Sequence, residues 1–152
     1  MLGKVISSNE QDLVLYIPTD FQSNNDPKGF KITCNGVDNP YNAFELFNQI
    51  QTKSPPWLYI GQYVMIELPE PKIFTYVLLQ AFYNVTFSVS GSNDGMAFEK
   101  LVEYKCGFNG IYRPIKFNNH KMYKIYKVTI ENIEEWNGNY GRKTGVHQIH
   151  LF

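Results

Sequence analysis

The chain has 152 residues and carries 14 Lys and Arg against 14 Asp and Glu, so it has no formal net charge at pH 7. This balance argues against a generically basic nucleic-acid-binding protein, and a hydrophobic content of 43% argues against a disordered chain. The length fits one domain, and we predict a single domain over 1–152 in which 1–35 either completes the fold or forms an N-terminal attachment arm.

Alternation of apolar and polar residues with a period of two predicts β-strands along most of the chain. The expected strands are, in chain order, 12–17, 29–33, 63–68, 73–82, 85–90, 101–106, 112–117, 122–130 and 146–152. The one helical pattern is 41–47, where Tyr41, Phe44 and Phe47 recur at intervals of three residues. Many short strands separated by turn residues predict an all-β sandwich or barrel.

Two sequence features mark expected strand ends. Pro69 and Pro71 lack a backbone N–H and are predicted to stop the strand that begins at Tyr63. The stretch 91–95, Gly-Ser-Asn-Asp-Gly, contains the residue types that tolerate positive φ, which predicts a tight reversal between two strands.

The two cysteines do not form a metal-binding pattern. Cys34 and Cys106 lie far apart in the sequence, without a CxxC motif or a His/Cys cluster, so no zinc site is predicted. We expect buried free thiols, with a disulfide across the sandwich as the alternative. The N-terminus shows no signal peptide and no stretch is apolar enough for a membrane helix; we predict a virion or extracellular surface location.

No set of residues resembles a catalytic site. His147 and His150 are three residues apart, so on a strand they point to opposite faces and cannot bind one metal ion. The sequence lacks a Gly-x-Ser-x-Gly elbow and a glycine-rich phosphate loop. We therefore predict that the chain is not an enzyme.

Binding of carbohydrate has better support, because sugars stack on exposed aromatic rings while polar side chains fix their hydroxyl groups. Two regions combine such residues: 39–42 together with 55–59, and the Gly- and Asn-rich segment 134–143. We expect Trp57 to pack in the core, with ligand binding as its alternative; for Trp136 the alternative to ligand binding is packing over the sheet edge. The candidate ligand-binding residues are Trp136, Tyr140, Arg142, Asn139, Tyr41, Asn42, Tyr59 and Arg113.

The order of motifs over about 40–152 resembles the discoidin family, also called coagulation-factor C-type domains, among the galactose-binding-like jelly rolls. The strongest match is 87–98, a strand followed by Gly-Ser-Asn-Asp-Gly and then an aromatic residue. Further matches are Ala43-Phe44 followed by Trp57, the strand 63–69, the strand 123–128 and the closing strand 147–152.

This resemblance implies a jelly-roll β-sandwich whose loops bind ligands at one end. It also implies a calcium site, because family members often hold calcium with an Asp-Gly-Asn-x-x-Thr loop and a Glu on the last strand. Here Glu45 replaces the Asp and the neutral Gln148 replaces that Glu, which removes an anionic ligand. We predict that no cofactor is required; the alternative is calcium held by Glu45, Asn48, Thr52 and Gln148.

The sequence thus predicts a non-catalytic carbohydrate-binding module that recognises a glycan or cell-surface carbohydrate. One hypothesis places it on a phage or virion surface or tail, where it contacts other virion proteins or its own copies. The alternative function is a structural assembly protein whose same loops make protein–protein contacts without sugar. Nucleic acid is not an expected partner, because the chain carries no net positive charge. A membrane is not expected either, because Glu134 and Glu135 flank the only loop whose Trp and basic residues suit a bilayer surface.

Overall fold

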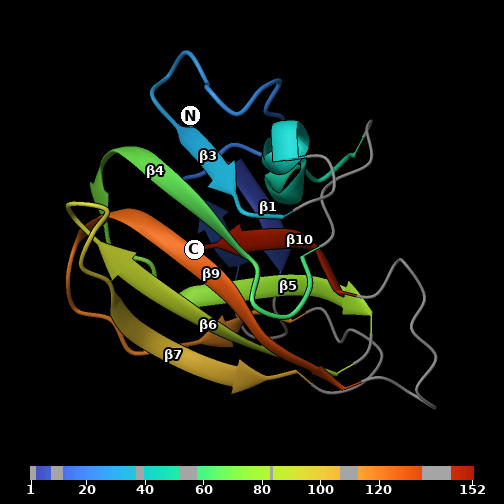
Figure 1. The fold of residues 1–152 in the computed structure, drawn as a ribbon. Helices are drawn as coiled ribbons and strands as arrows, with labels where there is room; N and C mark the ends of the chain where they lie inside the picture. Colours follow the sequence, from blue (N-terminus) through green and yellow to red (C-terminus); the bar gives the residue numbers. More distant parts are fainter. Residues whose placement is uncertain are drawn as a thin grey trace.

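The computed structural model of the chain describes residues 3–7, 12–36, 40–51, 58–82, 84–106, 113–134 and 145–152. Two antiparallel sheets face each other across one hydrophobic core (Figure 1). The larger sheet has five strands in the order β3-β4-β9-β6-β7, and the smaller has three in the order β10-β5-β8. The predicted all-β sandwich with one short helix near 41–47 is confirmed.

The elements have the following bounds, in chain order: β1 Gly3–Ser7, β2 Asp12–Leu15, β3 Lys31–Cys34, η1 Pro40–Phe47, β4 Tyr63–Lys72, β5 Tyr76–Phe82, β6 Asn84–Ser92, β7 Glu99–Lys105, β8 Ile115–Lys116, β9 Tyr123–Glu134 and β10 Gly145–Leu151. Strand β1 was not expected, and β5 begins three residues later than the sequence pattern indicated. The strand expected over 112–117 is reduced to β8, and residue 112 lies outside the described residues.

The predicted strand end at Pro69 and Pro71 is wrong, because β4 continues to Lys72. The pairing of β4 with β9 is irregular between Glu67 and Lys72. The prolines therefore occupy the part of β4 where no regular ladder requires a backbone N–H. Beyond this irregular part, β4 pairs with β9 again at Lys72.

The core lies between the inner faces of both sheets. Alternate residues of β4, β6 and β9 face alternate residues of β5 and β10, as a half-buried antiparallel sheet requires. The largest fully buried side chains include Tyr126, Phe47, Phe87, Ile32, Leu46, Leu58 and Ile66. Among the aromatic residues, Phe74, Phe87, Tyr126 and Phe152 are buried, whereas Tyr76 and Phe98 are only partly covered.

Helix η1 closes one side of the sandwich, where it contacts the edge strands β3 and β10 of the two sheets. It is a 3-10 helix, which has three residues per turn. The three-residue spacing of Phe44 and Phe47 matches that period and places both rings in the core. Tyr41 in its first turn points outward instead and is 87% exposed.

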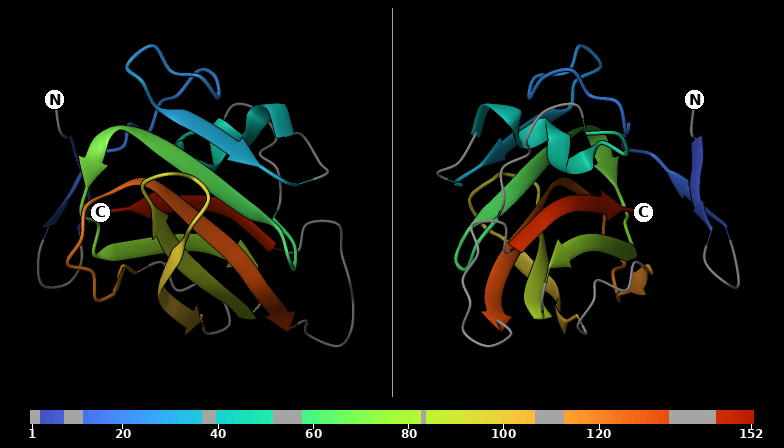
Figure 2. Two further views of the ribbon diagram at one scale, coloured as in Figure 1. Left: turned by 60° about the vertical axis from the view of Figure 1, so that its left-hand side comes forward. Right: turned by 90° about the vertical axis from the view of Figure 1, so that its right-hand side faces the viewer.

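The N-terminal hairpin of β1 and β2 lies outside the sandwich (Figure 2). Leu13 and Leu15 of β2 pack on Leu78 of β5 and on Phe152, which face away from the main core. Strand β2 therefore packs on the outer face of the smaller sheet. No helix among the described residues is long and apolar enough to span a membrane.

The two cysteines are free and partly buried, in agreement with the favoured prediction. Cys34 ends β3 and Cys106 follows β7, and these strands form opposite edges of the five-stranded sheet. Burial raises the pKa of Cys34, and it raises the pKa of Cys106 to about 11. Both thiols are therefore protonated at neutral pH and poorly nucleophilic.

Candidate functional site

The sandwich has two ends. At the loop end, β3, β5, β7 and β9 finish and β4, β6 and β10 begin; the turn end is the opposite one, where β6 turns into β7. At the loop end, Glu134 pairs with Asn84, and Gly145 pairs with Phe82. The predicted ligand-binding loops can be compared with this arrangement.

Four of the predicted ligand-binding residues are described. Tyr41 and Asn42 lie in η1, and Tyr59 follows Leu58, which pairs with Val146 at the start of β10. Arg113 is exposed and precedes β8, which pairs with the first two residues of β5, so no strand pairing places it at the loop end. The other predicted residues, Trp136, Asn139, Tyr140 and Arg142, lie outside the described residues, as does Trp57.

A pocket of about 330 Å³ opens between the segment 19–22 and η1. Its size matches small-ligand sites in proteins. It is lined by Thr19, Asp20, Phe21, Gln22, Phe44, Glu45, Asn48, Gln49 and Ile50. No sequence pattern predicted this pocket. Of its lining residues, only Glu45 and Asn48 were candidates, and only as calcium ligands.

Reciprocal hydrogen bonds hold the two walls of the pocket together. The Asn48 side chain accepts from the Phe21 backbone N–H at 2.8 Å and donates to the Phe21 carbonyl oxygen at 2.9 Å. The Asn24 side chain binds η1 in the same way, because it accepts from Phe44 N–H and donates to the Pro40 carbonyl oxygen. The pocket is therefore preformed by hydrogen bonds from two asparagine side chains to the backbone of segments more than 15 residues away.

The pocket combines hydrogen-bond acceptors with aromatic and aliphatic walls. Glu45 is 1% exposed, whereas Asp20 and Gln49 are exposed at the rim. Ile50, at 81% exposure, adds an apolar edge. Carboxylate and amide groups beside apolar surface can accept hydrogen bonds from hydroxyl or amino groups and cover the apolar face of a small molecule.

The residues implied as calcium ligands do not fit that metal. The oxygen of Asn48 already accepts from Phe21 N–H, and the Gln148 side chain directs its amide nitrogen toward backbone oxygens. Thr52 lies outside the described residues. Among the residues that the structure describes, no group of three or more His, Cys, Asp or Glu side chains could hold a metal ion. Calcium takes six to eight oxygen ligands, and among the residues that the resemblance implies only Glu45 offers a carboxylate.

The two C-terminal histidines, His147 and His150, differ in burial, and neither carries a charge. His150 is 4% exposed, and burial lowers its pKa to about 4. His147 is only partly buried, with a pKa that burial also lowers. Both side chains are therefore neutral at physiological pH.

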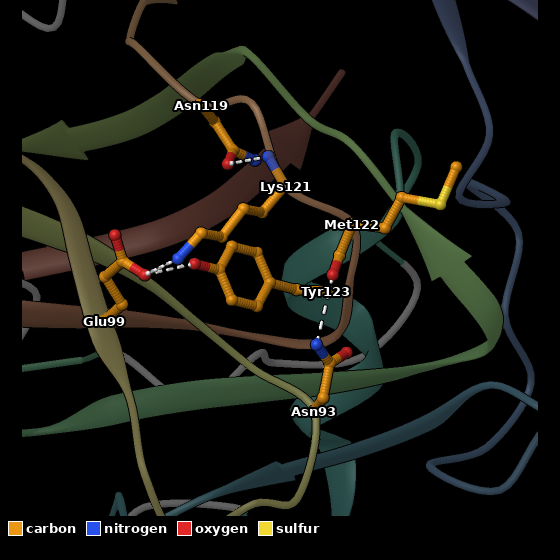
Figure 3. A network of polar contacts seen from close by, with 6 residues as sticks. All are labelled: Asn93, Glu99, Asn119, Lys121, Met122 and Tyr123. Atoms are coloured by element: carbon orange, nitrogen blue, oxygen red, sulfur yellow. Dashed lines mark hydrogen bonds and ion pairs between the residues drawn. The ribbon is translucent and has the colours of Figure 1, made fainter.

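The turn end contains a second set of polar residues, shown in Figure 3. The Tyr123 hydroxyl donates to the Glu99 carboxylate at 2.6 Å, and Lys121 approaches the same oxygen at 3.2 Å. The bond to Glu99 raises the pKa of Tyr123 to about 12, and bonds from Tyr123 and Lys121 lower the pKa of Glu99. Asn93 completes the group by donating to the Met122 carbonyl oxygen. These groups bind one another, which indicates a structural role.

Comparisons with known proteins support the fold. No protein-family model and no characterised protein matches the sequence. Among solved structures, the chain is similar to the CBM32 module of AlyQ in complex with 4,5-unsaturated mannuronic acid, with a TM-score of 0.55, 17% identity, and coverage of 80% of this chain and 92% of that one.

Two further solved structures show the same likeness. One is a pectin-binding carbohydrate-binding module, with a TM-score of 0.58 and 15% identity over 79% of this chain and 87% of that one. The other is CpGH89CBM32-5 from Clostridium perfringens in complex with GalNAc-β-1,3-galactose, with a TM-score of 0.55 and 16% identity over 81% of this chain and 94% of that one. At these identities, the likeness shows that the chain has the β-sandwich fold of these modules.

Proposed function

We propose that the chain is a non-catalytic carbohydrate-binding module of the discoidin-like group of galactose-binding-like folds. The observation that carries the proposal is its likeness in fold to modules that bind three different carbohydrates, over about four-fifths of its length in each case.

The binding surface that we propose is the loop end together with η1. Tyr41 offers an almost fully exposed ring, and Tyr59 lies beside the start of β10, the strand that follows the segment with Trp136 and Tyr140. Arg142, in the segment between β9 and β10, adds a cation that suits hydroxyl or carboxylate groups of a sugar. An aromatic ring with charged neighbours is the combination that sugar recognition requires.

The pocket beside η1 is the second part of this surface. Its acceptors, Asp20, Glu45 and Gln49, favour a neutral or cationic ligand group that donates hydrogen bonds. Arg142 favours acidic sugars instead. The two parts therefore predict different preferences, which binding data can separate.

A glycan array tests the proposal. It should contain uronic-acid oligosaccharides together with galactose- and N-acetylgalactosamine-containing glycans, because the similar modules are described with ligands of both kinds. We expect selective binding that Trp136→Ala removes if the loop end holds the sugar, and that Asp20→Ala removes if the pocket does. The matched control is Phe98→Ala, an aromatic deletion in the β6–β7 turn at the opposite end.

A blank array with a stable oligomer in sedimentation would contradict the proposal. That result would favour the alternative in which the same loops join copies of this chain, or other virion proteins, in an assembly. The virion setting itself stays a prediction, which genes adjoining the coding sequence can test.

A further inference from the structure

We infer that the amide groups of Gln51 and Gln148 hold the segment after η1 on β10 in the place where a cation would otherwise bind, so that this part of the fold is independent of calcium. The inference does not depend on the proposed function, because it concerns how the segment is held and can be measured without a sugar.

Four backbone oxygens converge on the two side-chain amides. Gln51 donates through Nε2 to the carbonyl oxygens of Glu45 at 2.9 Å and His147 at 2.6 Å. Gln148 donates through Nε2 to the carbonyl oxygen of Asn48 at 2.5 Å and lies 3.4 Å from that of Gln49. The oxygens thus come from the end of η1, from the residues that follow it and from β10.

These carbonyl oxygens need N–H donors or a cation beside them. A carbonyl oxygen can only accept, and several buried acceptors that face one another cost free energy unless a donor or a cation satisfies them. Calcium binds backbone carbonyl oxygens in such clusters. An amide NH₂ group has two N–H bonds, so Gln51 and Gln148 together supply one donor for each of the four oxygens.

The amide nitrogens of Gln51 and Gln148 occupy the space beside these oxygens. A neutral amide nitrogen is not a ligand for calcium, and Gln148 is buried at 7% exposure on β10, with its nitrogen directed at the loop. The side chain of Asn48 adds no further oxygen, because both its amide oxygen and its amide nitrogen are hydrogen-bonded to the Phe21 backbone. Glu45 is the one buried carboxylate of the described residues, which leaves too little negative charge for calcium.

Thermal unfolding of the wild-type chain tests the inference. We expect the same Tm in 5 mM EDTA and in about 5 mM CaCl₂, a concentration that saturates even weak protein sites. A Tm more than about 2 °C higher in calcium would overturn the inference, because a cation that binds only the folded state raises Tm by mass action. This measurement needs no variant and is independent of any loss of folding caused by substitution.

Two substitutions of Gln148 test the amide itself. Gln148→Leu removes both donors, and we expect a Tm lower by about 5 °C that calcium does not restore. Gln148→Glu places a carboxylate against two carbonyl oxygens, so Tm should fall in EDTA and recover in part when calcium is added. The matched control is Gln80→Leu, since Gln80 pairs with Gln148 on the neighbouring strand β5 but is only half-buried.

Each result has a defined meaning. A Gln148→Leu chain as stable as the wild type would show that the amide does not hold the segment, which would overturn the inference. A Gln148→Glu chain whose Tm does not respond to calcium would overturn it as well. If the Gln148 variants do not fold, Gln51→Leu replaces them, because Gln51 lies nearer the surface and makes the other pair of bonds.

Discussion

The turn end and the side formed by η1 use aromatic and polar residues in opposite ways. At the turn end, the Tyr126 hydroxyl is buried and donates to the Lys72 carbonyl oxygen while it accepts from Phe74 N–H and the Asn119 side chain. On the η1 side, Tyr41 is 87% exposed. The same residue type therefore stabilises one region and is available for contact in the other.

This difference distinguishes side chains that hold the fold together from side chains that are exposed to solvent. Polar groups that satisfy one another, such as Tyr123 and Glu99, have little capacity left for a ligand. Rim residues such as Asp20 and Ile50 lie in a pocket and face solvent. We therefore expect substitutions at the turn end to change stability and substitutions on the η1 side to change binding.

The largest expected effect is that of Tyr126→Phe. Removal of the hydroxyl breaks three hydrogen bonds and leaves the buried Asn119 side chain without one of its acceptors, at a cost of about 3 kcal/mol. Denaturant unfolding measures this change, which corresponds to a Tm lower by about 6 to 12 °C. The control Tyr104→Phe, on the exposed edge strand β7, should change stability by less than about 0.5 kcal/mol.

The second effect comes from Gly91→Ala in β6. A Cβ atom at Gly91 would overlap the ring of Tyr123, which lies directly over this glycine. We expect a destabilisation of about 2 kcal/mol, typical of overpacking in a buried contact. Gly36→Ala is the control, because its Cβ would meet only ordinary van der Waals contacts.

Combining Gly91→Ala with Tyr123→Ala tests the cause. If the overlap with the ring is responsible, the double variant should be more stable than the sum of the two single changes predicts. Additive effects would mean that Tyr123 is not the group that Gly91 accommodates.

A smaller effect should follow from acid. Backbone bonds from Ala97 and Met96 and the Ser92 hydroxyl lower the pKa of Asp94, and the bonds to Tyr123 and Lys121 lower that of Glu99. Because these folded-state pKa values lie below those of the unfolded chain, the stabilisation is present above the unfolded values and is lost as pH falls through the folded ones. Asp94→Asn and Glu99→Gln should therefore be less stable than the wild type at pH 7, and the difference should shrink at pH 3 in urea unfolding. A difference that stays constant with pH would show that the carboxylate charge is not what stabilises the turn.

The sequence predicted much of the turn end, because its signals are local. Gly95 has a φ of +77°, and Asp94 accepts from the N–H groups of Met96 and Ala97, two and three residues further on. Residue types within five positions determine such a turn. Strand alternation likewise determined the sandwich, since each side chain's face depends only on its own position in the strand.

The η1 side could not be predicted in the same way, because its contacts join distant residues. Asn48 meets Phe21, 27 residues away, and Gln51 meets His147, 96 residues away. No local pattern indicates that an amide will reach one particular carbonyl oxygen across the fold. The continuation of β4 past Pro69 was missed for the same reason, because the irregular pairing with β9 is a property of two strands and not of one.

The smallest expected effect on stability is that of Tyr41→Ala, which tests the other half of the comparison. The ring is 87% exposed, so its removal should change the free energy of unfolding by less than about 0.5 kcal/mol. If Tyr41 stacks on a sugar, the affinity for the glycan found on the array should fall about tenfold, since stacking of this kind contributes on the order of 1 kcal/mol. Titration calorimetry and thermal unfolding of the same preparation measure both quantities. A large loss of stability would contradict the division between the two regions, because an exposed tyrosine of η1 would then act as Tyr126 does at the turn end. Unchanged stability with unchanged affinity would keep the division and remove Tyr41 from the binding surface, which leaves Trp136 and the pocket as the places where the sugar is held.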